Sequence, residues 1–357
     1  MINRLPIIGS PITGSDIWRA LKSMNTARVG EKFRAAFSEF MQAQHVYGTN
    51  SGISSFYIIL DAMKQLSPGK EVILPAYTAG SLAVAVRKAG LTPVLCDISL
   101  EDFNLDIDFL PGAISKNTLA VAGVHSFGIS IKDIKDIRKK IPDNIFFIED
   151  CAQSMGTKVE ERQTGSFGDV SFFSFNRGKN LPLCSGGCIA TNNGKIAAAI
   201  EEEMKGLGNE SLLSDILSLS AVSCFSLAAN PFVYGAGFCL ISRFKDNAPP
   251  EDFKVGKMNG FQAGLGLGLM RRKEELFSAR YKNGMYLING LKDIELIILP
   301  GIQEHTYPVF NRLPVVFKDL SQRLLAQEKL WKCGVETSPM YTKPRHHMFD
   351  LGYKKDD

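Results

Sequence analysis

Three residues near the middle of the chain have the types and the spacing to hold one small molecule. Asp150 follows a short apolar run at residues 145–148, and Ser174 and Lys179 lie at and just beyond a second apolar run, residues 170–175. Apolar runs of this length suit strands that are buried on both faces, which are usually parallel. Because open α/β sheets bind ligands outside the carboxyl ends of their strands, we expect the three side chains to converge there.

An amine and a carboxylate in this arrangement suit the cofactor pyridoxal 5′-phosphate (PLP). A lysine in such a site can form a Schiff base with the PLP aldehyde. An aspartate can keep the pyridine nitrogen protonated, so that the ring accepts electrons. Lys179 and Asp150 are therefore the candidate catalytic residues. Alone, each has an ordinary interpretation as a surface lysine or a turn carboxylate, but the joint spacing with Ser174 and Gln153 favours the cofactor site.

The same block resembles a known family, the DegT/DnrJ/EryC1/StrS group of PLP-dependent sugar aminotransferases. The family's Glu-Asp-Ala-Ala-Gln motif is matched by Glu-Asp-Cys-Ala-Gln at residues 149–153. Its Gly-x-x-Gly-Asp motif is matched at residues 165–169. Its Phe-Ser-Phe motif, with a lysine five residues after the serine, is matched by Ser174 and Lys179. Several fixed spacings agree at once, which makes the resemblance specific.

The resemblance implies a fold and an activity. The fold is α/β, the PLP-dependent transferase fold type I, in which helices flank a mostly parallel sheet and a smaller C-terminal α+β domain follows. The activity is PLP-dependent transamination of a nucleotide-linked keto sugar, with L-glutamate as the usual amino donor, in the synthesis of surface polysaccharides or amino sugars. Relatives build their sites at a dimer interface, which implies a homodimer.

The resemblance also implies roles for single residues. Lys179 would carry PLP and, once released, move a proton during catalysis. Asp150 would stabilise the protonated pyridine, Gln153 would face the ring hydroxyl, and Ala152 would lie beneath the ring. Ser174 would bind the phosphate.

A glycine-bearing turn at residues 47–55 is the candidate partner of Ser174 in phosphate binding. It opens an apolar-periodic helix, and the N-terminus of a helix presents unpaired N–H groups and the positive end of the helix dipole. Taken alone, such a turn more often only caps its helix. The family has an Asn/Ser-Ser-Gly-Thr-type turn here, which implies that Gly52, Ile53 and Ser54 hold the phosphate.

Three further residues are candidate contacts of the cofactor or substrate. The resemblance predicts an aromatic ring stacked on the cofactor directly after Thr78, where this chain has Ala79. Tyr77 is the nearest ring that could replace it. His125, at the end of a buried apolar run, and Asn180, next to the candidate lysine, are candidate substrate contacts. For His125, a histidine that is only hydrogen-bonded beside the site is an equal alternative.

Composition narrows the class of protein. The 357 residues are 45% hydrophobic and 22% charged, ordinary values for a globular protein with a sizeable core. A net charge of +4 without a basic stripe gives no support for nucleic-acid binding. Seven scattered cysteines indicate free thiols in a reducing cytoplasm, and their spacing does not favour a metal site. The N-terminus lacks the apolar core of an export signal.

Alternating short apolar strands and helices predict a large PLP-binding domain over residues 1–245. A proline-rich polar break at residues 246–252 marks the expected boundary, and residues 246–357 are expected to form a small, shortened C-terminal domain. Residues 216–242 carry no charge. We expect a helical hairpin packed on the protein or at a subunit interface, with peripheral membrane contact as the alternative. One long helix is expected over residues 258–275.

Two other functions stay open. Some relatives are PLP-dependent sugar dehydratases with a histidine where Lys179 stands, so the lysine favours transamination. A catalytically weakened binding or regulatory homologue is suggested by Ala79, by Val255 in place of an asparagine that many relatives carry, and by the short C-terminus. Nitrogen transfer to a nucleotide keto sugar would separate transamination from dehydration, and the absorbance of a lysine-bound cofactor would test the third possibility.

Overall fold

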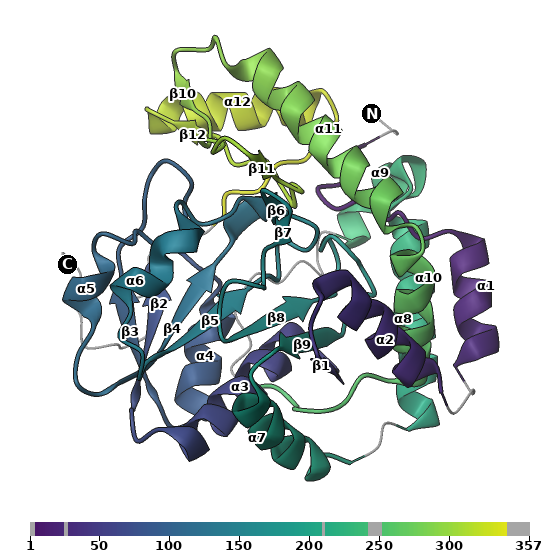
Figure 1. Cartoon of the computed structure of the whole chain (residues 1–357). Helices are drawn as coiled ribbons and strands as arrows, with labels where there is room; N and C mark the ends of the chain where they lie inside the picture. Colours follow the sequence, from purple (N-terminus) through teal and green to yellow (C-terminus); the bar gives the residue numbers. More distant parts are fainter. Residues whose placement is uncertain (1–3, 25–27, 209–210, 242–251, 341–357) are drawn as a thin grey trace.

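A seven-stranded, mostly parallel sheet forms the centre of the molecule (Figure 1). The computed structural model describes residues 4–24, 28–208, 211–241 and 252–340. The strand order is β1-β9-β8-β5-β4-β2-β3, and β9 is antiparallel to both of its neighbours while the others run parallel. The strands are β1 (His45–Thr49), β2 (Glu71–Pro75), β3 (Thr92–Cys96), β4 (Thr118–Val124), β5 (Phe146–Asp150), β8 (Val170–Ser174) and β9 (Gly187–Thr191).

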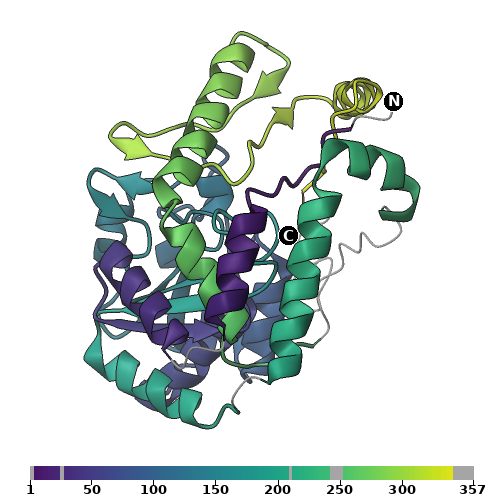
Figure 2. The ribbon, with the colours of Figure 1, turned by 90° about the vertical axis from the view of Figure 1, so that its right-hand side faces the viewer.

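Helices cover both faces of this sheet, which gives the α/β architecture that the sequence predicts (Figures 1 and 2). One face packs against α3 (Gly52–Leu66), α4 (Gly80–Lys88) and α7 (Gly194–Lys205). The other face packs mainly against five helices and a short 3-10 turn, η2. They are α1 (Gly14–Ser23), α2 (Val29–Met41), α5 (Leu110–Ala113), η2 (Ile134–Asp136), α6 (Ile137–Lys140) and α10 (Gly260–Met270).

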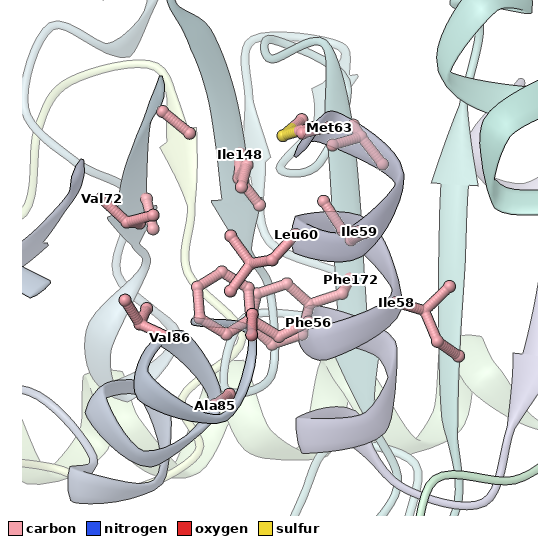
Figure 3. Close-up of a cluster of buried hydrophobic side chains, with 14 of the residues drawn as sticks. Phe56, Ile58, Ile59, Leu60, Met63, Val72, Ala85, Val86, Ile148 and Phe172 are labelled. Carbon is pink, nitrogen blue, oxygen red and sulfur yellow. The ribbon is translucent and has the colours of Figure 1, made fainter. Parts of the chain in front are cut away.

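The core follows from the alternation of side chains along buried strands. On β8, Phe172 faces α3, where its ring lies 5.1 Å from that of Phe56 (Figure 3). The next residue, Phe173, faces the opposite side and packs against Phe37 of α2, with the two ring centroids 5.0 Å apart. Strands apolar on both faces must be covered on both, which explains why the sheet lies between two helical layers.

A pair of apolar helices, α8 (Leu212–Ala228) and α9 (Pro231–Ile241), covers most of the uncharged segment at residues 216–242. Two polar side chains of α8 contact the start of α10: Asp215 accepts the Phe261 N–H at 2.7 Å, and the Ser218 hydroxyl accepts the Asn259 Nδ2 at 2.8 Å. The outward face carries leucines, and Leu217 and Leu227 are more than 60% exposed. Among the described residues, no single helix is long and apolar enough to cross a membrane. Together, α8 and α9 pass the same test only as a pair bent by 90°.

The C-terminal part of the chain adds α11 (Lys273–Leu291) and α12 (Leu320–Lys332) with two small sheets. One small sheet consists of β10 (Ile297–Ile298) and β12 (Val316–Phe317). The other joins β11 (Thr306–Tyr307) to β6 (Lys158–Val159) and β7 (Arg162–Gln163), so it ties this part to the large one. The expected boundary, residues 246–252, lies outside the described residues except for its last member.

The prediction of one helix over residues 258–275 is wrong, because the chain breaks between α10 and α11. Arg272 stands at this break, with φ −107° and ψ 11°. Its guanidinium donates to the buried carboxylate of Asp16 at 2.7 Å and to Glu275 at 3.0 Å. Pairing with a distant buried acid therefore holds the chain in a turn where local helical periodicity would have continued the helix.

Candidate active site

Asp150 and Ser174 end two adjacent parallel strands, β5 and β8. In this pair Asp150 lies opposite Phe172, so Ser174 lies two residues farther along at the same edge of the sheet. Lys179 follows in the loop after β8 and is half-buried. Its amine and the Asp150 carboxylate are close enough to shift each other's pKa. The structure therefore brings the acid, the hydroxyl and the amine to one edge.

The Asp150 carboxylate has one engaged oxygen and one that the protein does not use. Asp150 is only 5% exposed, and its Oδ1 accepts the backbone N–H of Ala152 at 2.8 Å. Within the described ranges, Oδ2 receives no hydrogen bond. Burial raises the pKa of Asp150, whereas the Ala152 N–H and the charges of Lys179 and His125 oppose this rise. A cationic N–H group of a ligand would find an acceptor at Oδ2.

The Lys179 amine lies in an environment that favours its neutral form. Burial is the main cause and lowers the pKa of Lys179 to about 8; Asp150 opposes the shift, and Arg312 adds to it. An amine with such a pKa is partly unprotonated near neutral pH, and the unprotonated amine is the nucleophile. Lys179 is therefore suited to condense with an aldehyde.

Glu149, one residue before Asp150, holds the loop beside the site. Its carboxylate accepts three backbone N–H groups of residues 165–168 at 2.6 to 2.8 Å, and it bonds the Nε2 of His125 at 2.9 Å. The Nδ1 of His125 accepts the Ile131 N–H at 3.2 Å. Both ring nitrogens of this fully buried histidine are thus engaged by the protein, which gives no support to a substrate contact.

Sequence reasoning gave Glu149 no role, although a signal for it was present. Successive side chains of a strand point to opposite faces of the sheet, so only one of two adjacent acidic residues can point toward the ligand. The other, Glu149, needs donors of its own because it is fully buried. The glycine-containing loop at residues 165–168 supplies them as backbone N–H groups.

The N-terminus of α3 lies against the end of β8. Ser51 caps this helix: its Oγ accepts the Ser54 N–H at 3.2 Å. A Cβ placed on Gly52 would lie 2.6 Å from the Ser174 Cβ and 3.1 Å from its Oγ, so only glycine permits this approach. The Ser54 hydroxyl donates to the Lys254 carbonyl at 3.1 Å. The first N–H groups of the helix and the Ser174 hydroxyl therefore lie together, an arrangement suited to phosphate.

Gln153 and Tyr77 both contact Phe127. The Oε1 of Gln153 accepts the Phe127 N–H at 3.3 Å, which leaves the amide nitrogen as the donor end for a ligand. The Tyr77 ring centroid lies 6.3 Å from that of Phe127, and its hydroxyl donates to the Met340 carbonyl at 3.0 Å. Tyr77 thus packs in a hydrophobic cluster that joins the two parts of the chain.

Asn180 holds loops together and is 2% exposed. Its Nδ2 donates to three backbone carbonyls: Met155 at 2.9 Å, Val309 at 3.0 Å and Gln153 at 3.3 Å. Its Oδ1 is buried and has no partner among the described residues. These contacts show that the Asn180 side chain holds the loops together. They give no support to the expectation that Asn180 contacts the substrate.

A family model matches almost the whole chain. The model describes the DegT/DnrJ/EryC1/StrS aminotransferase family and covers residues 17–356. The chain belongs to this family. The lipopolysaccharide biosynthesis protein RfbH of Salmonella typhimurium is 26% identical over 309 residues, which are 84% of this chain and 68% of that protein. A GDP-perosamine synthase of Caulobacter vibrioides is 30% identical over 203 residues, 55% of this chain and 54% of that protein.

A solved structure of another protein has the same fold as this chain. The Escherichia coli GDP-4-keto-6-deoxy-D-mannose-3-dehydratase with bound hydrated PLP matches with a TM-score of 0.77, over 98% of this chain and 89% of that one. Its sequence identity is 20%, so the likeness shows the fold alone. Together with the seven-stranded sheet, it confirms the predicted fold type I.

The residues present fit PLP, the cofactor of this family. Oδ2 of Asp150 is an available acceptor for a protonated pyridine nitrogen, and Lys179 supplies a nucleophilic amine. The N–H groups of Gly52 and Ile53, at the start of α3, lie beside Ser174 for the phosphate. We call these five candidate residues the PLP site.

Gly52→Ala is expected to weaken PLP binding about 10- to 100-fold, because the new Cβ displaces Ser174 or the start of α3. Fluorescence titration of the apoprotein measures the affinity. Gly194→Ala is the matched control, since Gly194, like Gly52, is the first residue of a helix, here capped by Asn193, but has open space around it. Equal affinity in the two variants would show that the close approach at Gly52 is not a phosphate cradle.

The rate at which the apoprotein captures PLP is expected to rise with pH and to level off above pH 8. The reason is the pKa of Lys179, about 8, below which the amine is mostly protonated and not nucleophilic. An ordinary lysine would still gain reactivity beyond pH 10. Stopped-flow absorbance across this range distinguishes the two profiles, and a rate still climbing at pH 10 contradicts the lowered pKa.

Proposed function

We propose that this chain catalyses the PLP-dependent transfer of an amino group to a keto sugar linked to a nucleotide, with L-glutamate as the donor. The observation that carries the proposal is that buried Asp150 and Lys179 lie close together at one edge of the sheet, where burial lowers the pKa of the lysine amine. Names of relatives support the substrate class, since one is a GDP-perosamine synthase. The setting we propose is the synthesis of surface polysaccharides or amino sugars.

The side chains of the PLP site divide the work between binding and proton transfer. When bound, PLP supplies an electron sink for the carbon that loses its proton. Asp150 holds a proton on the ring nitrogen, and Ser174 with the α3 N-terminus holds the phosphate. The Nζ of Lys179, with a pKa of about 8, can accept a proton and return it near neutral pH.

The two half-reactions test the proposal separately. PLP-loaded protein with L-glutamate is expected to release 2-oxoglutarate and leave the cofactor as its amine form. That form is then offered GDP-4-keto-6-deoxymannose and other nucleotide keto sugars, and mass spectrometry looks for an amino sugar. Protein that binds PLP but releases no keto acid with glutamate, glutamine or aspartate would support the binding-protein alternative.

Sugar dehydration is the second candidate, because a solved dehydratase has the same fold. A product that has lost oxygen and gained no nitrogen would establish it. Lys179 favours transamination, since a transaminase needs an amine that both carries PLP and moves the proton. The same mass spectra therefore decide between the two reactions.

A homodimer and a cytoplasmic location are further parts of the proposal. Sedimentation equilibrium measures the first, and fractionation of cells measures the second. Peripheral membrane contact through residues 216–242 stays the alternative to packing on the protein or at a subunit interface; flotation with lipid vesicles tests it. Outward leucines such as Leu217 and Leu227 make the measurement informative, because they present apolar surface to any partner.

A further inference from the structure

Three consecutive residues of the loop that carries Lys179 are bonded to the C-terminal part of the chain, one to α11 and two to the short segment at residues 309–311. Gly178 accepts at its carbonyl a hydrogen bond from the Asn311 side chain. Lys179 accepts at its carbonyl the Arg280 Nη2 at 2.9 Å. Asn180 donates from its side chain to the Val309 carbonyl at 3.0 Å. The backbone on both sides of the catalytic amine is therefore held from outside its own loop.

The same segment, residues 309–311, is also bonded to the loops that follow β4 and β5. The Val309 N–H donates to the Thr157 hydroxyl at 3.0 Å, and the Asn311 N–H donates to the Phe127 carbonyl at 2.9 Å. Gly128 permits this approach, because a Cβ there would lie 2.1 Å from the Val309 oxygen. The segment thus connects three loops at the ligand edge of the sheet.

Arg280, from α11, joins this segment to Lys179. Its guanidinium donates to the Lys179, Phe310 and Asn311 carbonyls at 2.9, 3.3 and 3.4 Å. No carboxylate forms an ion pair with it within the described residues, and burial lowers the pKa of Arg280 to about 10. It stays charged at neutral pH. Burying a cation whose described partners are carbonyls costs free energy. The planar guanidinium of an arginine also fixes the backbone that it binds better than the flexible ammonium of a lysine would.

We propose that Arg280 and Asn311 are positioning residues that fix the direction of the Lys179 amine. They act through the backbone of residues 178 and 179, whereas phosphate and ring nitrogen are bound elsewhere, by α3, Ser174 and Asp150. This inference rests on the proposed role of Lys179. Capture of PLP joins the amine nitrogen to the aldehyde carbon and releases one water, so it depends on that direction. Binding of pyridoxamine phosphate, which has no aldehyde, does not depend on the direction of the amine.

Arg280→Met is expected to slow PLP capture about 10- to 100-fold, the usual cost of misplacing a reacting group by about an ångström. The affinity for pyridoxamine phosphate is expected to stay within about twofold. Arg280→Lys, which keeps the charge and one donor, is expected to restore part of the rate. Arg323→Met is the matched control, because Arg323 is an exposed arginine of α12 outside the PLP site.

Stopped-flow absorbance gives the capture rate, and calorimetry gives the affinity for pyridoxamine phosphate. An unchanged capture rate, or equal losses in capture and in affinity, overturns the positioning role while leaving the proposed function intact. A wild-type apoprotein that never captures PLP contradicts the proposed function instead. If Arg280→Met does not fold, Asn311→Ala is measured by the same two criteria and decides the question.

Discussion

Replacing Lys179 by alanine is expected to abolish covalent capture of PLP and to lower transamination at least about 10⁴-fold. The amine is both the nucleophile and the proton carrier, and removal of one proton-transfer group alone costs up to about 10⁴-fold. Borohydride reduction followed by mass spectrometry of the chain measures capture directly. The wild type should gain one cofactor at Lys179, and the alanine variant none.

Two controls give this result its meaning. Lys132→Ala removes an exposed lysine that pairs with Glu101 at the surface, so capture and activity should not change. Binding of pyridoxamine phosphate to Lys179→Ala should persist, because Asp150, Ser174 and Gly52 remain. Reduced cofactor found on the Lys179→Ala chain would place the covalent lysine elsewhere and remove the basis of the proposed function.

Asp150→Asn is expected to lower turnover by on the order of 10³-fold while leaving the fold intact. The amide keeps an oxygen that can accept the Ala152 N–H, but it cannot hold a proton on the pyridine nitrogen. The variant should also capture PLP at lower pH, since the carboxylate holds the pKa of Lys179 up and its loss lets that pKa fall. Steady-state kinetics and the pH profile of capture measure both effects.

Glu149, the acidic residue before Asp150, is expected to affect stability where Asp150 affects turnover. Glu149→Gln replaces a carboxylate that accepts four hydrogen bonds. Leaving a buried donor without its acceptor costs about 1–3 kcal/mol, so this variant should lose free energy of unfolding, measured by urea denaturation. A Glu149 variant of full stability, or an Asp150 variant with normal turnover, would contradict the division of labour between the two carboxylates.

Much of the PLP site could be predicted because its members occupy short blocks of sequence. Residues 149–153 and 174–179 each lie at the end of a buried strand and in the loop after it, and parallel strands place their carboxyl ends at one edge. The glycine turn before α3 is likewise a local signal. Why position 52 must be a glycine follows only from the three-dimensional structure, where the missing Cβ makes room for Ser174.

Other parts of the site depend on contacts that spacing does not encode. Arg280 and Asn311 lie 101 and 133 positions from the carbonyls they bind, in a segment whose sequence shows only an ordinary helix and strand pattern. The break at Arg272 depends in the same way on Asp16. For His125, the choice between a ligand contact and a buried hydrogen-bonded residue required the positions of Glu149 and Ile131.

The pairing of β1 with β9 sets an order on biosynthesis. β1 stands immediately before the turn that opens α3, and in the described sheet it pairs with β9, residues 187–191. A nascent chain shorter than that cannot close the sheet, and such distant pairings form slowly. Translation must therefore pass Lys179 before the turn that opens α3 has its partner in the sheet, so we expect a cofactor that binds there to load only after the whole large sheet has been synthesised.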